Sequence, residues 1–331
     1  MIYLESDKYF APYNLALEQW VFENLNMDDC LILWRNNKSV IIGKNQNYRK
    51  EVDIEYLNSK EVPVVRRMTG GGAVYHDLGN INFTFIKRSK EKPKFDFEFY
   101  SKIIVSLLES FRLPVSMSGR NDILLDGKKV SGSAQIINRD GVLHHGTLIF
   151  DVDLEEMTSA LTPEQGKLKL RGVDSIRSRV TNIRPYLKKD SDTVGFMKKI
   201  RKFFFSVYDL REYKLKTEDK SALKQIQNER YGNREWNFSE FSCQRGKEIK
   251  KYERFEGVGG IEVSILLDEN ERITSIDFSG DYFSGDIDAI TESLLGANLK
   301  KEELTERLKD IELNSRIYNL TVGQLVSLLL K

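Results

Sequence analysis

Residues 64–85 read VVRRMTGGGAVYHDLGNINFTF, and the predicted fold and function both depend on this stretch. A basic pair, Arg66 and Arg67, leads into the triplet Gly70–Gly72 and then into a β-like run. Three glycines in a row are costly to order, because each loses much conformational freedom on folding. Such a run is typical of backbone that approaches a ligand and aims N–H groups at negative charge, or of a tight turn between strands. The glycines alone leave both interpretations open.

The residues that follow the glycines predict a strand of an antiparallel sheet. Ile81, Phe83 and Phe85 alternate with Asn82 and Thr84, which is the pattern of a half-buried strand. Further strands are predicted over 30–36 and 39–43, joined by a turn at two asparagines, and over 63–67, 73–76 and 142–154. Helical periodicity predicts helices over 12–25, 53–60, 95–111, 191–208 and 217–230.

A second informative stretch is GRNDILLDGKKVSGSAQ, residues 119–135. Asp126-Gly127 lies between two apolar runs and predicts a type I′ hairpin turn. Lys128 and Lys129 follow this turn. Because successive side chains on a strand face opposite ways, at most one of the two lysines points inward.

Composition predicts an ordinary globular protein. The chain has 331 residues, 40% of them hydrophobic and 31% charged, and 51 basic residues balance 50 acidic ones, so no overall basic field favours nucleic acid as a partner. Cys30 and Cys243 are too few for a disulfide framework or a four-cysteine zinc site. The opening MIYLESDKYF lacks a signal-peptide pattern and no apolar run reaches membrane-spanning length, so we expect a cytoplasmic protein without a membrane partner.

The C-terminal part predicts a separate module. Residues 231–251 are polar and weakly periodic, which is typical of a domain boundary. Beyond them we expect a hairpin that turns at 268–271 and three short helices over 286–331, the last capped by Thr321. We therefore expect domains at 1–240 and 252–331 joined by a linker over 241–251.

The chemistry-bearing residues exclude several classes of enzyme. His144 and His145 are neighbours on a predicted strand and would face opposite ways, which disfavours a shared metal site. Neither cysteine lies in the glycine, lysine or histidine segments, and SGS at 131–133 is not a nucleophile elbow. No P-loop motif occurs. A glycine-rich turn beside Arg66 and Arg67, with an inward lysine, suits an anion whose charge grows during reaction, although solvated surface groups explain the same residues.

Four segments, in this order, resemble the signature motifs of lipoate-protein ligases. They are RRMTGGGAVYHDLGNINFTFI (66–86), GRNDILLDGKKVSGSAQ (119–135), HHGTL (144–148) and VDSIRSRVTNI (173–183). The resemblance covers most of residues 1–240, and the tail from about residue 252 resembles the accessory domain of the long-form ligases. It implies an α+β fold of the biotin and lipoate ligase type, with a mixed, mainly antiparallel sheet, packed helices and a small α+β C-terminal domain.

The resemblance also implies an activity. Lipoate attacks the α-phosphate of ATP to give lipoyl-AMP, with Mg²⁺ neutralising the triphosphate, and a lysine of a lipoyl carrier then attacks the mixed anhydride and releases AMP. The implied carriers are the apo lipoyl domains of the E2 subunits of 2-oxoacid dehydrogenases and the H protein of glycine cleavage. The accessory domain is implied to dock over the adenylate site and to move between the two half-reactions.

Site residues follow from the same resemblance, position by position. Lys129 matches the lysine that contacts the lipoyl carbonyl and the phosphate, and Asp122 a polar position near phosphate and metal. The other expected binding residues are Arg67, Gly70, Gly71, Gly72, Ala73, Val74, Tyr75, His76, Asn121, His145, Ser178, Thr181 and Asn182. For the apolar tunnel that a lipoyl tail needs, Leu17, Trp20 and Val74 are candidates that core packing explains equally well.

Two other functions stay open on the sequence. Octanoyltransferases and lipoyl amidotransferases resemble the same motifs, and some of them use a cysteine nucleophile without ATP. Both cysteines here lie outside the motifs, and an accessory module follows, which favours the ligase. A non-catalytic protein that binds lipoate or nucleotide is the third possibility.

Overall fold

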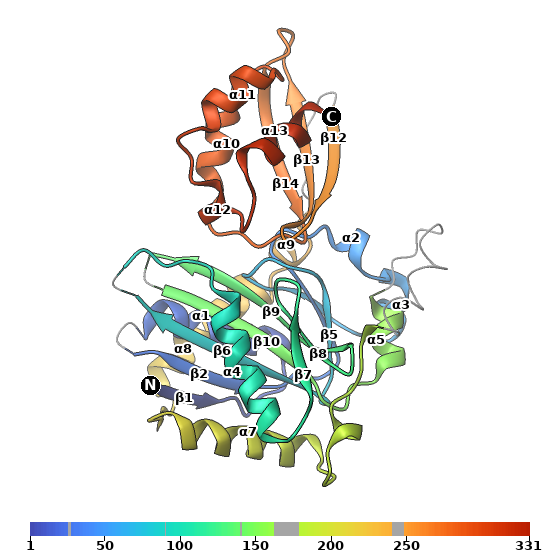
Figure 1. The fold of residues 1–331 in the computed structure, drawn as a ribbon, viewed down its shortest axis with the longest axis vertical. Coiled ribbons are helices and arrows are strands. Elements are labelled where there is room, and N and C mark those ends of the chain that lie inside the picture. Colours follow the sequence, from blue (N-terminus) through green and yellow to red (C-terminus); the bar gives the residue numbers. More distant parts are fainter. Residues whose placement is uncertain (26–27, 90, 140, 162–178, 240–247) are drawn as a thin grey trace.

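The computed structural model describes residues 1–25, 28–89, 91–139, 141–161, 179–239 and 248–331. A larger N-terminal part holds an extended sheet, and a smaller C-terminal part stands on one end of it (Figure 1). Within these ranges no helix has the length and apolar character that crossing a membrane requires.

The main sheet has eight strands in the order β11-β1-β2-β6-β10-β9-β8-β7. β1 runs parallel to β2 and β11, whereas the other neighbours are antiparallel, so the sheet is mixed and mainly antiparallel as predicted. The bounds are β1 Ile2–Glu5, β2 Cys30–Trp34, β6 Asn80–Arg88, β7 Val115–Ser118, β8 Asp122–Leu125, β9 Lys128–Asn138, β10 Gly141–Ile149 and β11 Arg211–Glu212. Asp126 and Gly127 both have positive φ, 52° and 72°, which confirms the type I′ turn between β8 and β9.

A second, three-stranded sheet lies beside the first. It has the order β4-β3-β5, with β3 Ser39–Ile42, β4 Val64–Arg66 and β5 Val74–His76. The strands predicted at 30–36 and 39–43 therefore lie in different sheets and do not pair as a hairpin. Asn36 is buried where the chain passes from one sheet to the other, with Asn14 donating to its Oδ1 over 2.8 Å and its own Nδ2 3.1 Å from Nδ1 of His76.

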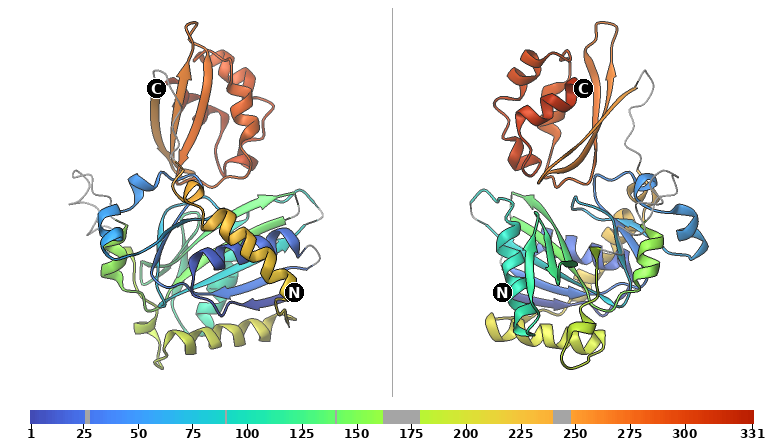
Figure 2. Two further views of the ribbon diagram at one scale, coloured as in Figure 1. Left: turned by 180° about the vertical axis from the view of Figure 1, so that it is seen from behind. Right: turned by 45° about the vertical axis from the view of Figure 1, so that its right-hand side comes forward.

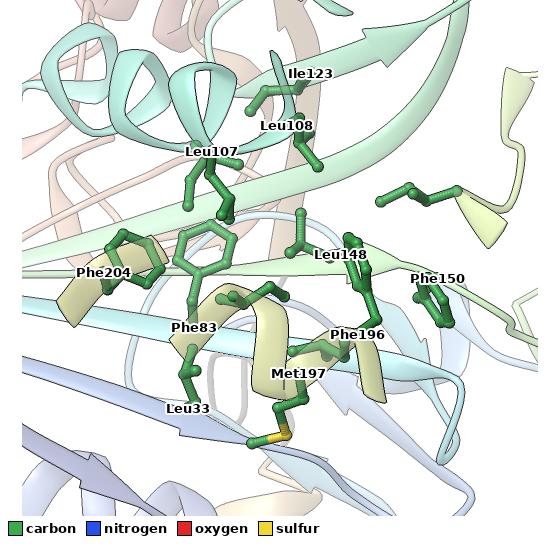
Figure 3. Close-up of a cluster of buried hydrophobic side chains, with 14 of the residues drawn as sticks. Leu33, Phe83, Leu107, Leu108, Ile123, Leu148, Phe150, Phe196, Met197 and Phe204 are labelled. Carbon is green, nitrogen blue, oxygen red and sulfur yellow. The ribbon is translucent and has the colours of Figure 1, made fainter. Parts of the chain in front are cut away.

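Two helices cover one face of the main sheet. α4 (Phe97–Ser110) and α7 (Thr193–Val207) pack on Leu33, Phe83 and Leu148, and Phe150 stacks on Phe196 with ring centroids 4.4 Å apart (Figure 3). Burying these side chains supplies the main stabilisation of this face.

The other face of the sheet is covered by α1 (Ala11–Asn24) and α8 (Thr217–Ile226), which lie in front of the sheet in the left view of Figure 2. Pro12 lies in the first turn of α1, as predicted. The remaining helices among the described residues of this part are α2 Tyr48–Glu51, α3 Ile54–Ser59, α5 Leu154–Ala160 and α9 Arg234–Asn237, with short 3₁₀ and π turns at Arg184–Tyr186 and Gln227–Tyr231.

The C-terminal part has its own sheet and core. β12 (Glu248–Phe255), β13 (Gly259–Leu267) and β14 (Ile273–Gly280) form a meander, and β12 begins within the range 241–251 that the sequence assigned to a linker. The helices are α10 Asp288–Leu294, α11 Lys301–Leu308, α12 Leu313–Arg316 and α13 Val322–Leu330. The prediction of three helices missed α12, which is a single turn, whereas the Thr321 cap of α13 is confirmed.

Candidate functional site

A cavity of about 110 Å³ lies between the two sheets. Its floor is the main sheet, and its roof is the second sheet together with the glycine loop, residues 67–73. Strand β6 explains why the cavity is there. Asn82 and Thr84, the polar positions of the alternating pattern, are 1% and 0% exposed because their side of β6 faces the site and α1.

The register of the sheet fixes the floor of this cavity. Trp34 on β2 is opposite Asn82 on β6, and Asn82 is opposite Thr147 on β10. The hydroxyl of Thr147 in turn reaches the carbonyl of Gly132 on β9. Cross-strand neighbours share a face, so these residues form a row that runs from β2 to β9. Strands lie about 4.8 Å apart, so the row is roughly 14 Å long.

Lys129 stands at the β9 end of this row. Pairing between β8 and β9 skips Val130, which marks a bulge that changes which way side chains point. Nζ of Lys129 lies 2.8 Å from Oδ1 of Asp122 and over the bare backbone of Gly132. Lys128 points to solvent instead, so the expectation of one inward lysine is confirmed.

Arg67 shapes the glycine loop from inside. Its Nη2 donates to the carbonyls of Gly70 and Gly72 over 2.6 and 2.8 Å, Nη1 to Ile41, and Nε to Thr69. Burial lowers the pKa of Arg67 to about 10, and the guanidinium therefore stays charged at neutral pH. The arginine fixes the roof of the cavity and lends it positive charge.

Arg66 does not belong to the site, although the sequence paired it with Arg67. It points away from the cavity on β4, and its guanidinium donates to carbonyls of the loop 43–46 and of α9, including Gln46 over 2.7 Å and Trp236 over 2.9 Å. Successive residues of a strand face opposite ways, so only one arginine of the pair can reach the cavity.

A buried polar chain links the glycine loop to α1. Oγ1 of Thr69 lies 2.8 Å from Nε2 of His145, and Nδ1 of the same imidazole lies 2.9 Å from Oε1 of Glu18. Thr84 donates to the same Glu18 oxygen and accepts from Nε1 of Trp34 over 3.0 Å. His145 is thus held in a network and lines the cavity without a free ring nitrogen.

Two buried polar atoms at the Trp34 end have no partner among the described residues: Nε2 of His76 and Nδ2 of Asn82. Both side chains line the cavity. Burial, together with Arg67 and His145, lowers the pKa of His76 to about 3, so its imidazole is neutral. In this state His76 offers the cavity a neutral N–H group and no positive charge.

A second cavity adjoins the first and shares part of its wall. Both are lined by Gly72, Ala73, Val74, Lys129, Gly132 and Thr147, and the second continues past Tyr75 to Val180 and to Asp281 of the C-terminal part. The backbone N–H of Thr181 donates to the carbonyl of Lys129, whereas Asn182 pairs with Val152 and does not line either cavity. Ser178 lies outside the described residues.

The C-terminal part touches the glycine loop directly. The carbonyl of Tyr282 accepts the N–H of Gly71 over 3.1 Å, and a Cβ added at Gly70 would come within 2.2 Å of that oxygen. Phe283 packs against Phe97, with ring centroids 4.7 Å apart. Gly70 is therefore needed for this close approach and lines neither cavity.

Comparison with known proteins decides the family. The model of the lipoyl protein ligase A/B catalytic domain matches residues 11–205, and that of the bacterial lipoate protein ligase C-terminus matches 246–329. Lipoate-protein ligase LplJ of Bacillus subtilis is 32% identical over 99% of this chain and 100% of its own, and lipoate–protein ligase 1 of Staphylococcus aureus is 33% identical over 91% and 90%. The chain belongs to the lipoate-protein ligase family.

Solved structures agree with the fold of this ligase. The bipartite lipoate protein ligase of Thermoplasma acidophilum, whose structure was reported with its E2 lipoyl domain, is 26% identical, with a TM-score of 0.64 over 72% of this chain and 95% of its own. LipL1 of P. falciparum in complex with lipoate has a TM-score of 0.77 over 99% of each chain at 22% identity. Lipoate-protein ligase A bound with ATP has a TM-score of 0.60 at 24% identity over 72% and 97%. The last two support the fold alone.

The sequence analysis did not single out several residues of the ligase site, among them Leu15, Trp34 and Glu18. Leu15 and Trp34 line the cavity, whereas the tunnel candidates Leu17 and Trp20 face the core between α1 and the sheet; Val74 does line the cavity. Glu18 was also missed. A carboxylate inside the apolar run LALEQWVF is a signal that could have found it, because such a group is buried only with partners.

Replacing Gly132 should displace Lys129 without disturbing the fold. A Cβ at Gly132 would lie 2.7 Å from Cε and Nζ of Lys129, which are the flexible end of a side chain, so Gly132→Ala moves the ammonium rather than the backbone. We expect the rate of lipoate activation to fall by about tenfold or more at an unchanged melting temperature. Gly323→Ala, where a Cβ meets open space, is the matched control, and an unchanged rate for Gly132→Ala would contradict this position of Lys129.

Proposed function

We infer that the protein is an ATP-dependent lipoate-protein ligase, which forms lipoyl-AMP from lipoate and ATP and transfers the lipoyl group to a lysine of a carrier domain. The observation that carries this inference is that the ammonium of Lys129 lies where the two cavities meet. A cation at a shared wall can neutralise charge on an acid in one cavity and on a phosphate in the other.

The first cavity, which we call the acyl cavity, suits the acid. The carboxylate of lipoate would pair with Lys129, and the apolar chain of lipoate would cross the floor toward Trp34, under Val74, Ile41 and Leu15. We propose that His145, whose ring is fixed by Glu18, holds the acyl chain of lipoate in place. We also propose that Arg67 keeps the glycine loop closed over this chain.

The second cavity suits the nucleotide, whose phosphates would lie beside Gly72 and Ala73 and whose adenosine would lie toward Tyr75 and Val180, the neighbour of Thr181. We propose that Ser178 and Asn182 support this side. Mg²⁺ fits the donor set around the phosphates, because it binds nucleotides through one or two carboxylates, phosphate oxygens and water. Asp122 is the carboxylate at hand and Asn121 lines the adjacent wall, whereas no cluster of three metal-binding side chains occurs in the described ranges.

Two displacements follow from this arrangement. A carboxylate oxygen of lipoate attacks the α-phosphorus, and the bond to pyrophosphate breaks. The amine of the carrier lysine then attacks the lipoyl carbonyl, loses a proton, and the bond to AMP breaks. Lys129 stabilises the negative charge that develops on phosphate and carbonyl oxygens in both steps, and the site otherwise acts by positioning.

We further propose that residues 1–240 are the catalytic domain, 252–331 the accessory domain, and 241–251 the connection. The Tyr282 carbonyl of the accessory domain accepts a hydrogen bond from the backbone N–H of Gly71, so one N–H group of the glycine loop is occupied. We expect the domain to leave this position when the nucleotide site fills, and an unchanged scattering envelope with lipoyl-AMP bound would count against it. The proposed carriers are the lipoyl domains of 2-oxoacid dehydrogenase E2 subunits and the glycine cleavage H protein.

Pyrophosphate release separates the ligase from an ATP-independent acyltransferase. We expect pyrophosphate from ATP only when lipoate is present, with no carrier needed. Cys30 does not support the transferase, because it is 1% exposed, burial raises the pKa of its thiol, and it lies away from the cavities. Acyl transfer from an acyl-carrier donor without ATP would overturn the ligase, and lipoate binding without pyrophosphate release would favour a non-catalytic binding protein.

A further inference from the structure

Asn82 carries a hydrogen-bond donor that the fold does not use. The side chain is 1% exposed, and its Oδ1 accepts from Nδ2 of Asn80 over 2.9 Å. Its own Nδ2 has no partner among the described residues, and the side chain lines the acyl cavity. Buried donors are almost always paired in folded proteins, so an unpaired one at a binding cavity points to a ligand.

A second donor lies at the same end of the cavity. Nδ1 of His76 faces Nδ2 of Asn36, which can only donate, so the ring hydrogen is on Nε2, and Nε2 is also unpaired. His76 contacts Trp34 edge to face with ring centroids 5.9 Å apart, and Trp34 is opposite Asn82 in the sheet. Two N–H groups and an indole therefore surround one end of the cavity, and Lys129 lies at the other end.

The sheet register gives the distance of this end from Lys129. Asn82 on β6 and Gly132 on β9 are separated by β10 alone, which makes two strand spacings, about 9.6 Å. An acid whose carboxylate pairs with Lys129 therefore brings the far end of an extended eight-carbon chain to Asn82. In lipoate that end carries the two sulfur atoms of the dithiolane ring, and sulfur is a weak hydrogen-bond acceptor.

We propose that Asn82 is a specificity-determining residue, whose side-chain N–H favours acids with a hydrogen-bond acceptor at the distal end over purely hydrocarbon acids of the same shape. This inference rests on the proposed function. Its physical basis is that a hydrocarbon end leaves the Asn82 donor buried and unpaired, which lowers the affinity of the competitor. The dithiolane of lipoate is the group that Asn82 would select.

The test is calorimetric binding to the full chain of lipoate and of 5-cyclopentylpentanoate, its carbocyclic analogue without sulfur. We expect the wild type to bind lipoate about five- to tenfold more tightly, and Asn82→Leu to lose most of this preference, chiefly by binding the analogue better. Thr147→Val removes a hydroxyl from the same floor nearer Lys129 and should keep the wild-type preference.

The outcomes separate this inference from the function on which it rests. Equal affinities of the wild type for both acids would overturn the role of Asn82, and this measurement does not depend on the folding of any variant. An Asn82→Leu protein that is folded and keeps the full preference would also overturn it. If the wild type binds neither acid, the proposed function itself fails.

Discussion

Lys129→Ala should lose lipoyl-AMP formation by a factor of about 10² to 10³, because it removes the cation at the wall that the two cavities share. The fold should survive the change. The side chains of Lys129 and Asp122 are 32% and 34% exposed, so the remaining carboxylate can be solvated. The rate of lipoate-dependent pyrophosphate release and the melting temperature are the two measurements.

Lys128→Ala is the matched control for this variant, because Lys128 is the adjacent residue, carries the same charge and faces solvent. It should retain the wild-type rate. Lys129→Arg should recover little activity, since a guanidinium is larger than an ammonium and the end of this side chain lies close to Gly132. A Lys129→Ala protein that forms lipoyl-AMP at close to the wild-type rate would refute the mechanism.

Arg67→Gln should have the second-largest effect, on both stability and activity. The change removes the hydrogen bonds from the guanidinium to the buried carbonyls of Ile41, Gly70 and Gly72. It also removes the positive charge near Glu18. We expect a loss of about 3–5 kcal/mol in the free energy of unfolding, measured by denaturant titration. We also expect activation to fall by more than about tenfold, because the roof of the acyl cavity loses its shape.

Arg184→Gln provides the comparison for Arg67. Arg184 pairs with Asp151 and Asp190 on the surface, where ion pairs contribute little to stability, so this variant should resemble the wild type. If Arg67→Gln were as stable and active as Arg184→Gln, the guanidinium could not be the group that holds the glycine loop.

The sequence predicted the residue types of the site better than their directions. Alternation along β9 showed that one of two lysines faces inward, but the bulge that aims Lys129 over Gly132 depends on pairing with β8 and has no local signal. The same alternation could have shown that Arg66 and Arg67 point to opposite faces, but the glycine triplet beside them suggested one binding site for both. Arg66 contacts α9, which lies some 170 residues further along the chain, so no local pattern could have predicted its partners.

Partners distant in the sequence explain the other differences. Thr84 and Asn82 alternate with apolar residues in the way that is typical of the solvent-facing side of a strand, yet α1 and the glycine loop cover them. Leu17 and Trp20 are as apolar as Leu15 and Trp34, so composition cannot tell which of them line the cavity. The packing of α1 on the sheet places Leu15 and Trp34 there and leaves Leu17 and Trp20 in the core. By contrast, the turn at Asp126-Gly127 was predictable because its signal lies within the turn itself.

The most direct test of the account is the mass of an apo lipoyl domain after incubation with the protein, lipoate and Mg²⁺, with and without ATP. We expect the carrier to gain one lipoyl group on a single lysine, only when ATP is present, and no gain with the Lys129→Ala protein. A carrier that is acylated equally well without ATP, or one that stays unmodified while the protein binds lipoate, would contradict it.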